Sequence, residues 1–204
     1  MGSIAVTMWS EQDRHDGGRQ RLFETVRSFR PAGAALYPGS YVDIAPSLVF
    51  PRVTYVDVDE RTVRFFADRE GLAQIVGDER ARGITFIHGD YTESLDVPDE
   101  SVDLLVSLYA GFVSEACTQY LRVGGTLLVN PSHGDAAMAS IDPRYRLIAA
   151  VHVRDGRHRI RTDDLESYLV PSEPVEITPQ LLHERRRGIA YTRAPFAYLF
   201  ERVA

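Results

Sequence analysis

The stretch ALYPGSYVDIAPSLVFPRVTYVDVD, residues 35–59, contains the clearest pattern of secondary structure in the sequence. It opens with a short apolar run, turns at PGS (residues 38–40), and closes on a second run rich in β-branched and aromatic residues that ends at Asp59. Only a short helix fits between the two runs, because Pro46 and Pro51 interrupt that segment. This order predicts the first βαβ unit of a doubly wound α/β sheet.

The turn after the first predicted strand has the chemistry of a ligand-binding loop. Gly39 can adopt a positive φ and lets a ligand approach the backbone, and Ser40 offers a hydroxyl and an N–H. Asp43 would repel a phosphate but would attract an amino group, which points away from a dinucleotide. A plain turn, with Asp43 capping the short helix that follows, stays open as an alternative.

Acidic residues also follow the next two predicted strands. Asp59 closes the strand at 54–58, where ligands of open α/β sheets bind, and its carboxylate is suited to accept hydrogen bonds from ribose hydroxyls. It can equally cap the next helix. Asp90 follows the strand at 84–88 and would accept a hydrogen bond from an exocyclic amine.

Composition excludes several classes of protein. The chain has 204 residues, a net charge of −6 and no lysine, so it lacks the phosphate-binding lysine of a P-loop and the Schiff-base lysine of a pyridoxal enzyme. Its acidic balance does not favour nucleic acid. Cys117 is the only cysteine, and we expect it to be a buried thiol. Without a long apolar run, we expect a cytoplasmic protein that does not enter membranes.

We expect a single domain, residues 1–204. It includes an N-terminal segment, a hairpin and a last strand in addition to the βαβ units. Residues 1–18 predict a flexible segment or a flap over the site. His15 in that segment suggests a metal ligand, but no further ligands follow at helical spacing and we expect no metal site. The Asp-Gly turn within 145–162 predicts a hairpin. Residues 196–203 predict a last antiparallel strand at or near the edge of the sheet.

Four segments in order, VTYVDVD, ITFIHGDY, LDVPDESVDLLVS and YLRVGGTLLV, resemble the sequential motifs of the class I S-adenosylmethionine-dependent methyltransferases. The resemblance covers residues 34–130. It implies a Rossmann-like, mostly parallel sheet with an antiparallel C-terminal strand and S-adenosylmethionine as cofactor. The cofactor-binding residues it implies are Pro38, Gly39, Ser40, Asp43, Asp59 for the ribose, Asp90 and Tyr91 for the adenine, and Ser107.

One departure from the family concerns the first loop. The usual loop has several glycines close together, and here Tyr41 and Asp43 stand at the later glycine positions. Either Asp43 reaches the amino group of the cofactor, or cofactor binding is weakened. We favour the first interpretation, because Asp59 and Asp90 are retained and Asp43 has the right charge.

The candidate catalytic residues lie after the fourth and fifth predicted strands. Tyr109 ends the fourth strand, and His133 follows the fifth within NPSHGD, where a histidine is suited to act as a base. The expected reaction is methyl transfer to a small molecule. No base-flipping tetrad follows the fourth strand, since the chain has SLYA there. The oligomeric state stays open, with a homodimer as one alternative.

Two other functions stay open. The altered loop and the lack of an evident catalytic motif favour a degenerate relative that binds a nucleoside or a partner without turnover. A nicotinamide-dependent dehydrogenase is the third alternative, and it is weakened by the missing G-x-G-x-x-G pattern and by Asp43, which would face a pyrophosphate.

Overall fold

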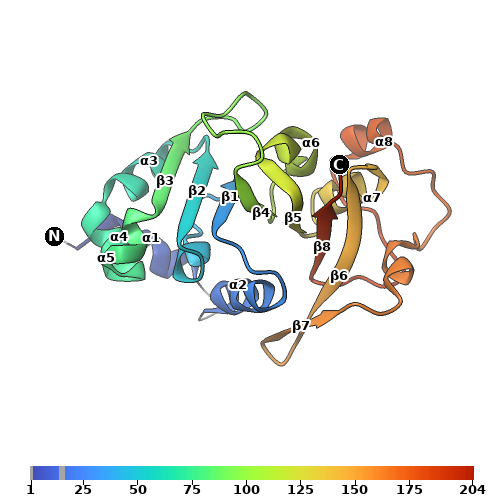
Figure 1. Ribbon diagram of the computed structural model, residues 1–204, viewed down its shortest axis with the longest axis horizontal. Helices are drawn as coiled ribbons and strands as arrows, with labels where there is room; N and C mark the ends of the chain where they lie inside the picture. The colour runs from blue at the N-terminus through green and yellow to red at the C-terminus, as the bar shows by residue number, and fades with distance from the viewer. Residues whose placement is uncertain (1, 14–16) are drawn as a thin grey trace. The chain divides into compact units, whose positions relative to one another are not determined.

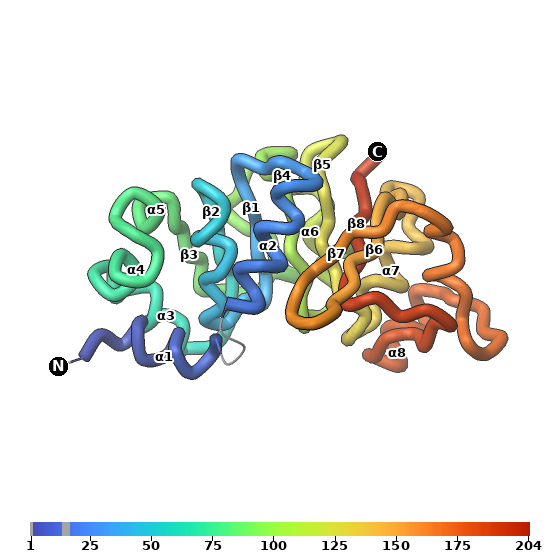
Figure 2. Tube along the Cα trace, turned by 90° about the horizontal axis from the view of Figure 1, so that it is seen from below, coloured from blue at the N-terminus to red at the C-terminus, as the bar shows by residue number. Residues whose placement is uncertain are grey.

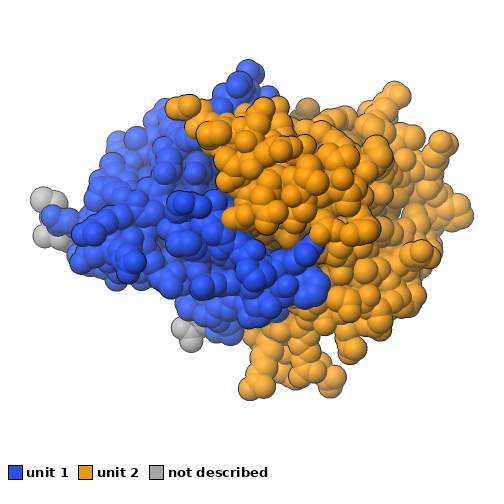
Figure 3. All heavy atoms as spheres, viewed as in Figure 1, with its two compact units in different colours: residues 1–95 blue, residues 96–204 orange. Residues whose placement is uncertain are grey.

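The computed structural model describes residues 2–13 and 17–204, so the predicted environment of His15 lies outside the described residues. The chain divides into two compact units, Met1–Leu95 and Asp96–Ala204 (Figure 3). Both units combine β-strands with helices (Figure 1).

The first unit contains three parallel strands in the order β3-β2-β1. They are β1 (Ala34–Pro38), β2 (Arg52–Asp57) and β3 (Ile84–His88). Its helices are α1 (Ile4–Gln12), α2 (Gly18–Phe29), the 3-10 helix η1 (Ala45–Leu48), α3 (Glu60–Ala67), α4 (Arg69–Val76) and α5 (Asp78–Arg82). The short helix predicted between the first two strands is η1.

Aromatic packing holds β1, α2 and η1 together. Phe23 on α2 is fully buried and contacts the rings of Tyr37 and Phe50 edge-on. Tyr55 on β2 continues this cluster, and its hydroxyl lies 2.7 Å from the Ser47 hydroxyl of η1. Burying aromatic side chains of this size stabilises the layer that carries the loop after β1.

Residues 4–12, within the segment expected to be flexible or a flap, form helix α1. It lies beside α3 and α4 (Figures 1 and 2). Ser3 caps its N-terminus by accepting a hydrogen bond from the N–H of Val6. The Ser3 hydroxyl also donates to the Asp68 carboxylate, which caps α4 through the N–H of Gly71. One carboxylate therefore joins the starts of two helices.

The second unit contains five strands in the order β4-β5-β8-β6-β7. They are β4 (Val102–Ser107), β5 (Leu121–Val129), β6 (Tyr145–Arg154), β7 (Arg157–Arg161) and β8 (Ala197–Arg202). β4 and β5 are parallel, and the pairs β5–β8, β8–β6 and β6–β7 are antiparallel. Its helices are α6 (Val113–Cys117), η2 (Thr118–Tyr120), α7 (Asp135–Ile141), η3 (Leu165–Leu169) and α8 (Pro179–Arg185).

The predicted fold class, parallel strands with an antiparallel C-terminal strand, is confirmed. The sequence predicts the last strand at or near the edge of the sheet; β8 does not form the edge but lies between β5 and β6, with β7 beyond them. Residues 197–200 are all buried, as expected of a strand covered on both faces. The pair β6 and β7 forms a hairpin, and its turn residues Asp155 and Gly156 both have positive φ. In the described part of the chain, no helix has the length and apolar character needed to cross a bilayer.

Candidate functional site

The loop after β1 has a left-handed backbone at two positions. Gly39 has φ 65° and donates its N–H to the Val56 carbonyl of β2 over 2.8 Å. Tyr41 has φ 47°, a conformation that glycine adopts freely but that costs a side-chain-bearing residue free energy. Tyr41 stands at a position where the resembling family has glycine. The backbone conformation that a glycine favours is therefore present here without one.

Asp57 ties this loop to the end of β2. Its Oδ2 accepts a 2.6 Å hydrogen bond from the N–H of Tyr41, and its Oδ1 accepts one of 2.9 Å from the N–H of Asp59. Asp57 is the last residue of β2, the position that we predicted for Asp59. A carboxylate at the carboxyl end of a strand is where an α/β sheet binds ligands.

Asp59 caps α3, one of the two roles that the sequence left open. Its carboxylate accepts hydrogen bonds from the N–H of Arg61 at 2.9 Å and from both sides of the Arg61 guanidinium. The Arg61 side chain lowers the pKa of Asp59 to about 2, and the backbone N–H of Arg61 adds to this effect. Asp59 therefore stays ionised, with a cation already bound to it.

The carboxylate of Asp43 faces the interior of the first unit. It is 2% exposed and accepts hydrogen bonds from the Tyr37 hydroxyl at 3.1 Å and the N–H of Ala45 at 3.2 Å. Burial raises the pKa of Asp43, and the Arg19 guanidinium, 3.4 Å away, opposes that shift. The predicted contact between Asp43 and a ligand ammonium would therefore require Arg19 to move.

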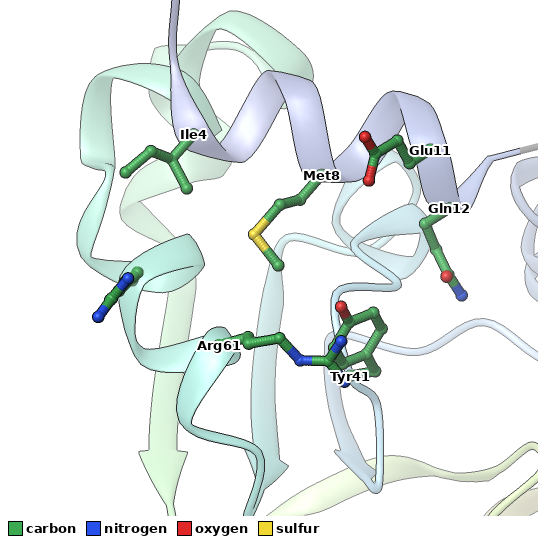
Figure 4. Close-up of a pocket in the computed structure, with 7 residues that line it drawn as sticks. Ile4, Met8, Glu11, Gln12, Tyr41 and Arg61 are labelled. Atoms are coloured by element: carbon green, nitrogen blue, oxygen red, sulfur yellow. The ribbon is translucent and has the colours of Figure 1, made fainter.

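A pocket of about 500 Å³ lies between α1, the loop after β1 and the start of α3 (Figure 4). Helix α1 contributes Ile4 and Met8 to its walls, and Figure 4 shows both side chains pointing into it. The Arg61 guanidinium lies over the Tyr41 ring, 4.9 Å from the ring centre. The remaining lining residues are Glu11, Gln12 and Arg64. The volume lies in the range of small-molecule sites, roughly 300–1,000 Å³.

The other predicted cofactor residues of the first unit lie at the end of β1 and in the loops that follow β1 and β3. Pro38 ends β1, and Ser40 is buried with its hydroxyl directed to the Tyr41 carbonyl. Asp90 follows β3 and is exposed. Its Oδ1 accepts hydrogen bonds from the N–H and the hydroxyl of Thr92, and the backbone bond, the larger cause, lowers the pKa of Asp90. Tyr91, the next residue, is half-buried.

In the second unit, Ser107 is buried and its hydroxyl is committed to an internal partner. It donates to the carboxylate of Asp135 over 2.5 Å. Ser114 on α6 donates to the same carboxylate through both its N–H and its hydroxyl. Asp135 therefore joins β4, α6 and α7, and burial raises its pKa to about 6.

The two candidate catalytic residues lie in two loops, and the side chain of Asn130 forms hydrogen bonds to both loops. Tyr109 is 51% exposed, has φ 60°, and donates its N–H to Oδ1 of Asn130 over 3.1 Å. Ser132 donates to the same oxygen over 2.9 Å, and its Oγ lies 2.8 Å from Nδ1 of the exposed His133. Positive φ at a tyrosine is a form of strain that is common at functional sites.

Sequence reasoning missed Asp57 and Asn130, and where it expected a flexible segment or a flap over the site, helix α1 lines the pocket. The signal for Asp57 was present in VDVD, because the second aspartate of that segment is suited to cap a helix, which leaves the first to end the strand. Residues 2–13 and 17–204 contain no cluster of three or more His, Cys, Asp or Glu side chains arranged to hold a metal ion.

Comparison with known proteins supports the fold. No protein-family profile matches the sequence, and no curated protein matches it. A solved structure of a putative O-methyltransferase from Klebsiella pneumoniae aligns with 78% of this chain and 88% of its own, with 16% identity and a TM-score of 0.52. The chain has the Rossmann-like fold of the class I methyltransferases.

Likenesses with lower TM-scores link the chain to other solved structures. The N-methyltransferase NodS from Bradyrhizobium japonicum, solved with S-adenosylhomocysteine, matches 76% of this chain and 92% of its own, with 16% identity and a TM-score of 0.47. The [4+2]-cyclase SpnF matches 54% of this chain, with 19% identity and a TM-score of 0.42. This chain spans only 44% of the length of SpnF.

Proposed function

We propose that this protein is an S-adenosylmethionine-dependent methyltransferase that acts on a small-molecule acceptor. The observation that carries the proposal is the pocket beside Tyr41 and Arg61, next to the strand-end carboxylate of Asp57, in a chain with a methyltransferase fold. The net charge of −6 disfavours nucleic acid as the acceptor.

The residues of the first unit fit a nucleoside. Carboxylates are suited to accept hydrogen bonds from two neighbouring ribose hydroxyls. Asp57 is the last residue of β2, and Asp59 caps the helix that follows it. Apolar Ile4 and Met8 offer contact to a planar base. Asp90 and Tyr91 stay our candidates for the adenine, and the turn at 38–40 for the methionine part.

In the second unit, Tyr109 and His133 stay our candidates for the reaction itself. When bound, the cofactor supplies an electrophilic methyl group on sulfur. The protein has to align the acceptor with this group and, for an oxygen acceptor, remove a proton. Both side chains are exposed and lie in the loops that follow the parallel strands β4 and β5, which suits contact with an acceptor.

Calorimetric titration with S-adenosylmethionine, S-adenosylhomocysteine and NAD tests the binding part of the proposal. We expect micromolar binding of the first two, none of NAD, and at least tenfold weaker binding of the first two by Asp57→Ala. Absence of binding by either sulfur compound contradicts the proposal. Release of S-adenosylhomocysteine in a screen of small alcohols, phenols and amines then tests transfer, with His133→Gln lowering turnover at unchanged cofactor affinity.

A nucleoside-binding protein without turnover is the second candidate. The observations that favour it are the internal commitment of Asp43 to Arg19 and the side chain at position 41, where the resembling family has glycine. The two candidates differ in turnover and not in cofactor binding. Tight binding with no transfer to any acceptor class would favour the second.

A further inference from the structure

A series of three hydrogen bonds connects the backbone N–H of Tyr109 with the ring of His133, and the direction of each bond follows from the one before it. The chain runs from the backbone N–H of Tyr109 to Oδ1 of Asn130 (3.1 Å), then to Oγ of Ser132 (2.9 Å), then to Nδ1 of His133 (2.8 Å). Asn130 is 4% exposed, whereas Tyr109, Ser132 and His133 are exposed.

The first link fixes the side-chain amide of Asn130. The oxygen and the nitrogen of an asparagine side-chain amide have nearly the same shape, so their assignment depends on their hydrogen-bond partners. A backbone N–H is always a donor. The atom of Asn130 that faces the N–H of Tyr109 must therefore be the acceptor Oδ1. The same atom faces the Ser132 hydroxyl, so this hydroxyl must donate to it.

The second link fixes the imidazole of His133. A serine hydroxyl has one proton, and Ser132 uses it toward Asn130. Toward Nδ1 of His133, Ser132 can then only accept. Nδ1 must therefore carry a proton, which leaves Nε2 of the neutral ring with a free lone pair.

We infer that Asn130 and Ser132 are positioning residues that hold His133 in its Nδ1–H tautomer, with Nε2 ready to take a proton. Protonation at Nε2 breaks none of these hydrogen bonds, because Nδ1 donates to Ser132 in both the neutral and the charged ring. The tautomer stands independently of the proposed function, whereas its use in catalysis rests on that function.

For an acceptor alcohol or phenol, the step balances as follows. The acceptor oxygen forms a bond to the methyl carbon, its proton passes to Nε2 of His133, and the electron pair of the broken carbon–sulfur bond stays on sulfur. A histidine with the opposite tautomer would present an N–H at Nε2 and could not accept this proton.

The loop that carries Ser132 is held from a second side. Gly188 donates its N–H to the Ser132 carbonyl over 3.3 Å, and a Cβ on Gly188 would clash with the Pro131 carbonyl. On the C-terminal side of the loop, Asp135 is buried and bonded to Ser107. These contacts fix the loop backbone, so the orientation of His133 depends on the two side-chain bonds.

Nitrogen-15 NMR of the histidine rings tests the inference on the full-length protein. In weakly basic solution, where imidazoles are neutral, we expect His133 to show a protonated Nδ1 and an unprotonated Nε2. The chain has six histidines, so the signal is assigned by its loss in His133→Gln. A free histidine side chain favours the Nε2–H form, and finding that form at His133 would overturn the inference.

Variants separate the effect of these hydrogen bonds on His133 from general effects on folding. Ser132→Ala should shift His133 toward the Nε2–H form, and Asn130→Asp should keep the Nδ1–H form because a carboxylate accepts both bonds. Ser101→Ala, at an exposed serine bonded to the Pro98 carbonyl, is the matched control and should change nothing. An unchanged ring in Ser132→Ala contradicts the inference even if the wild-type tautomer is as expected.

The same variants separate the tautomer of His133 from its use in catalysis. If the tautomer is Nδ1–H but S-adenosylmethionine does not bind, the proposed function fails and the structural inference holds. If the cofactor binds and methyl transfer occurs, Ser132→Ala should lower kcat at least tenfold with little change in KM, and Asn130→Asp should restore most of the rate. Equal rates in wild type and Ser132→Ala would remove the catalytic role.

Discussion

The backbone N–H of Tyr41 donates a 2.6 Å hydrogen bond to the carboxylate of Asp57. This bond joins the loop after β1 to the last residue of β2. The second oxygen of Asp57 accepts from the N–H of Asp59, where α3 begins. A hydrogen bond to a charged acceptor is stronger than one between neutral groups, so Asp57 orders three segments at the carboxyl ends of the strands.

The first prediction compares Asp57 with Asp59. We expect Asp57→Ala to weaken binding of S-adenosylmethionine at least tenfold, because it removes the strand-end carboxylate and frees the loop. Asp59→Ala should weaken binding less, since the Asp59 carboxylate already binds Arg61. Calorimetry on both variants measures the difference. A larger loss of affinity in Asp59→Ala than in Asp57→Ala would indicate that Asp59 contacts the ribose.

Stability provides a control for this comparison. Asp57→Ala should lower the free energy of unfolding by about 1.5–3 kcal/mol, the contribution of a hydrogen bond to a charged acceptor. Asp57→Asn keeps one acceptor oxygen and should fall between the wild type and Asp57→Ala in urea unfolding. If all three proteins unfold alike, the carboxylate does not order the loop.

The second prediction concerns the ring of Tyr41 at the pocket. Tyr41→Gly relieves a left-handed backbone, a gain of roughly 1 kcal/mol that the flexibility of glycine offsets in part. We therefore expect little change in stability but several-fold weaker cofactor binding, because the ring lines the pocket. Tyr41→Phe should bind as the wild type does. Tighter binding by Tyr41→Gly would show that the ring obstructs the site.

Local signals predicted much of the fold from the sequence. The turn at 38–40 and the Asp-Gly hairpin turn each depend on residues within a few positions of one another. The position of β8 between β5 and β6 depends on pairing between strands far apart in sequence, which no local pattern encodes.

The candidate site was predictable only in part for a related reason. Asp57 and Asp59 differ by two residues, and the boundary between β2 and α3 decides which of them ends the strand. Asp43 has the charge expected of an ammonium partner, but its burial beside Tyr37 and Arg19 comes from packing. Polarity alone does not show which way a side chain faces.

The third prediction concerns the attachment of α1, which covers the pocket. Asp68→Ala removes the acceptor of the Ser3 hydroxyl (2.7 Å) and the N-cap of α4, and should cost about 1 kcal/mol of stability. Ser3→Ala removes the bond to Asp68 while α4 keeps its cap. Both variants should speed hydrogen exchange in residues 4–12 and weaken cofactor binding, since Ile4 and Met8 line the pocket. Unchanged exchange in both would show that other contacts hold α1.

The fourth prediction is a pH dependence of stability that originates at Asp135. Burial raises the pKa of Asp135 from an ordinary value of 3.8 to about 6, against the opposing effect of hydrogen bonds from Ser107 and Ser114. Between about pH 4 and pH 6 the folded protein therefore binds more protons at this site than the unfolded chain does. The free energy of unfolding must then fall as the pH rises through this window, and level off above it.

Other carboxylates act in the opposite sense, so the test is a difference between two proteins. The lowered pKa values of Asp68 and Asp90 stabilise the folded state at higher pH, but they are common to the wild type and to Asp135→Asn. Urea unfolding of both proteins from pH 4 to pH 7 should show the wild type losing up to about 3 kcal/mol of free energy of unfolding relative to the variant. This is the value that linkage gives for a carboxyl whose pKa rises from 3.8 to about 6 on folding. A difference that stays constant, or that changes in favour of the wild type as the pH rises, would mean that the Asp135 carboxyl is ionised at low pH, with the Ser107 and Ser114 hydroxyls compensating for its burial.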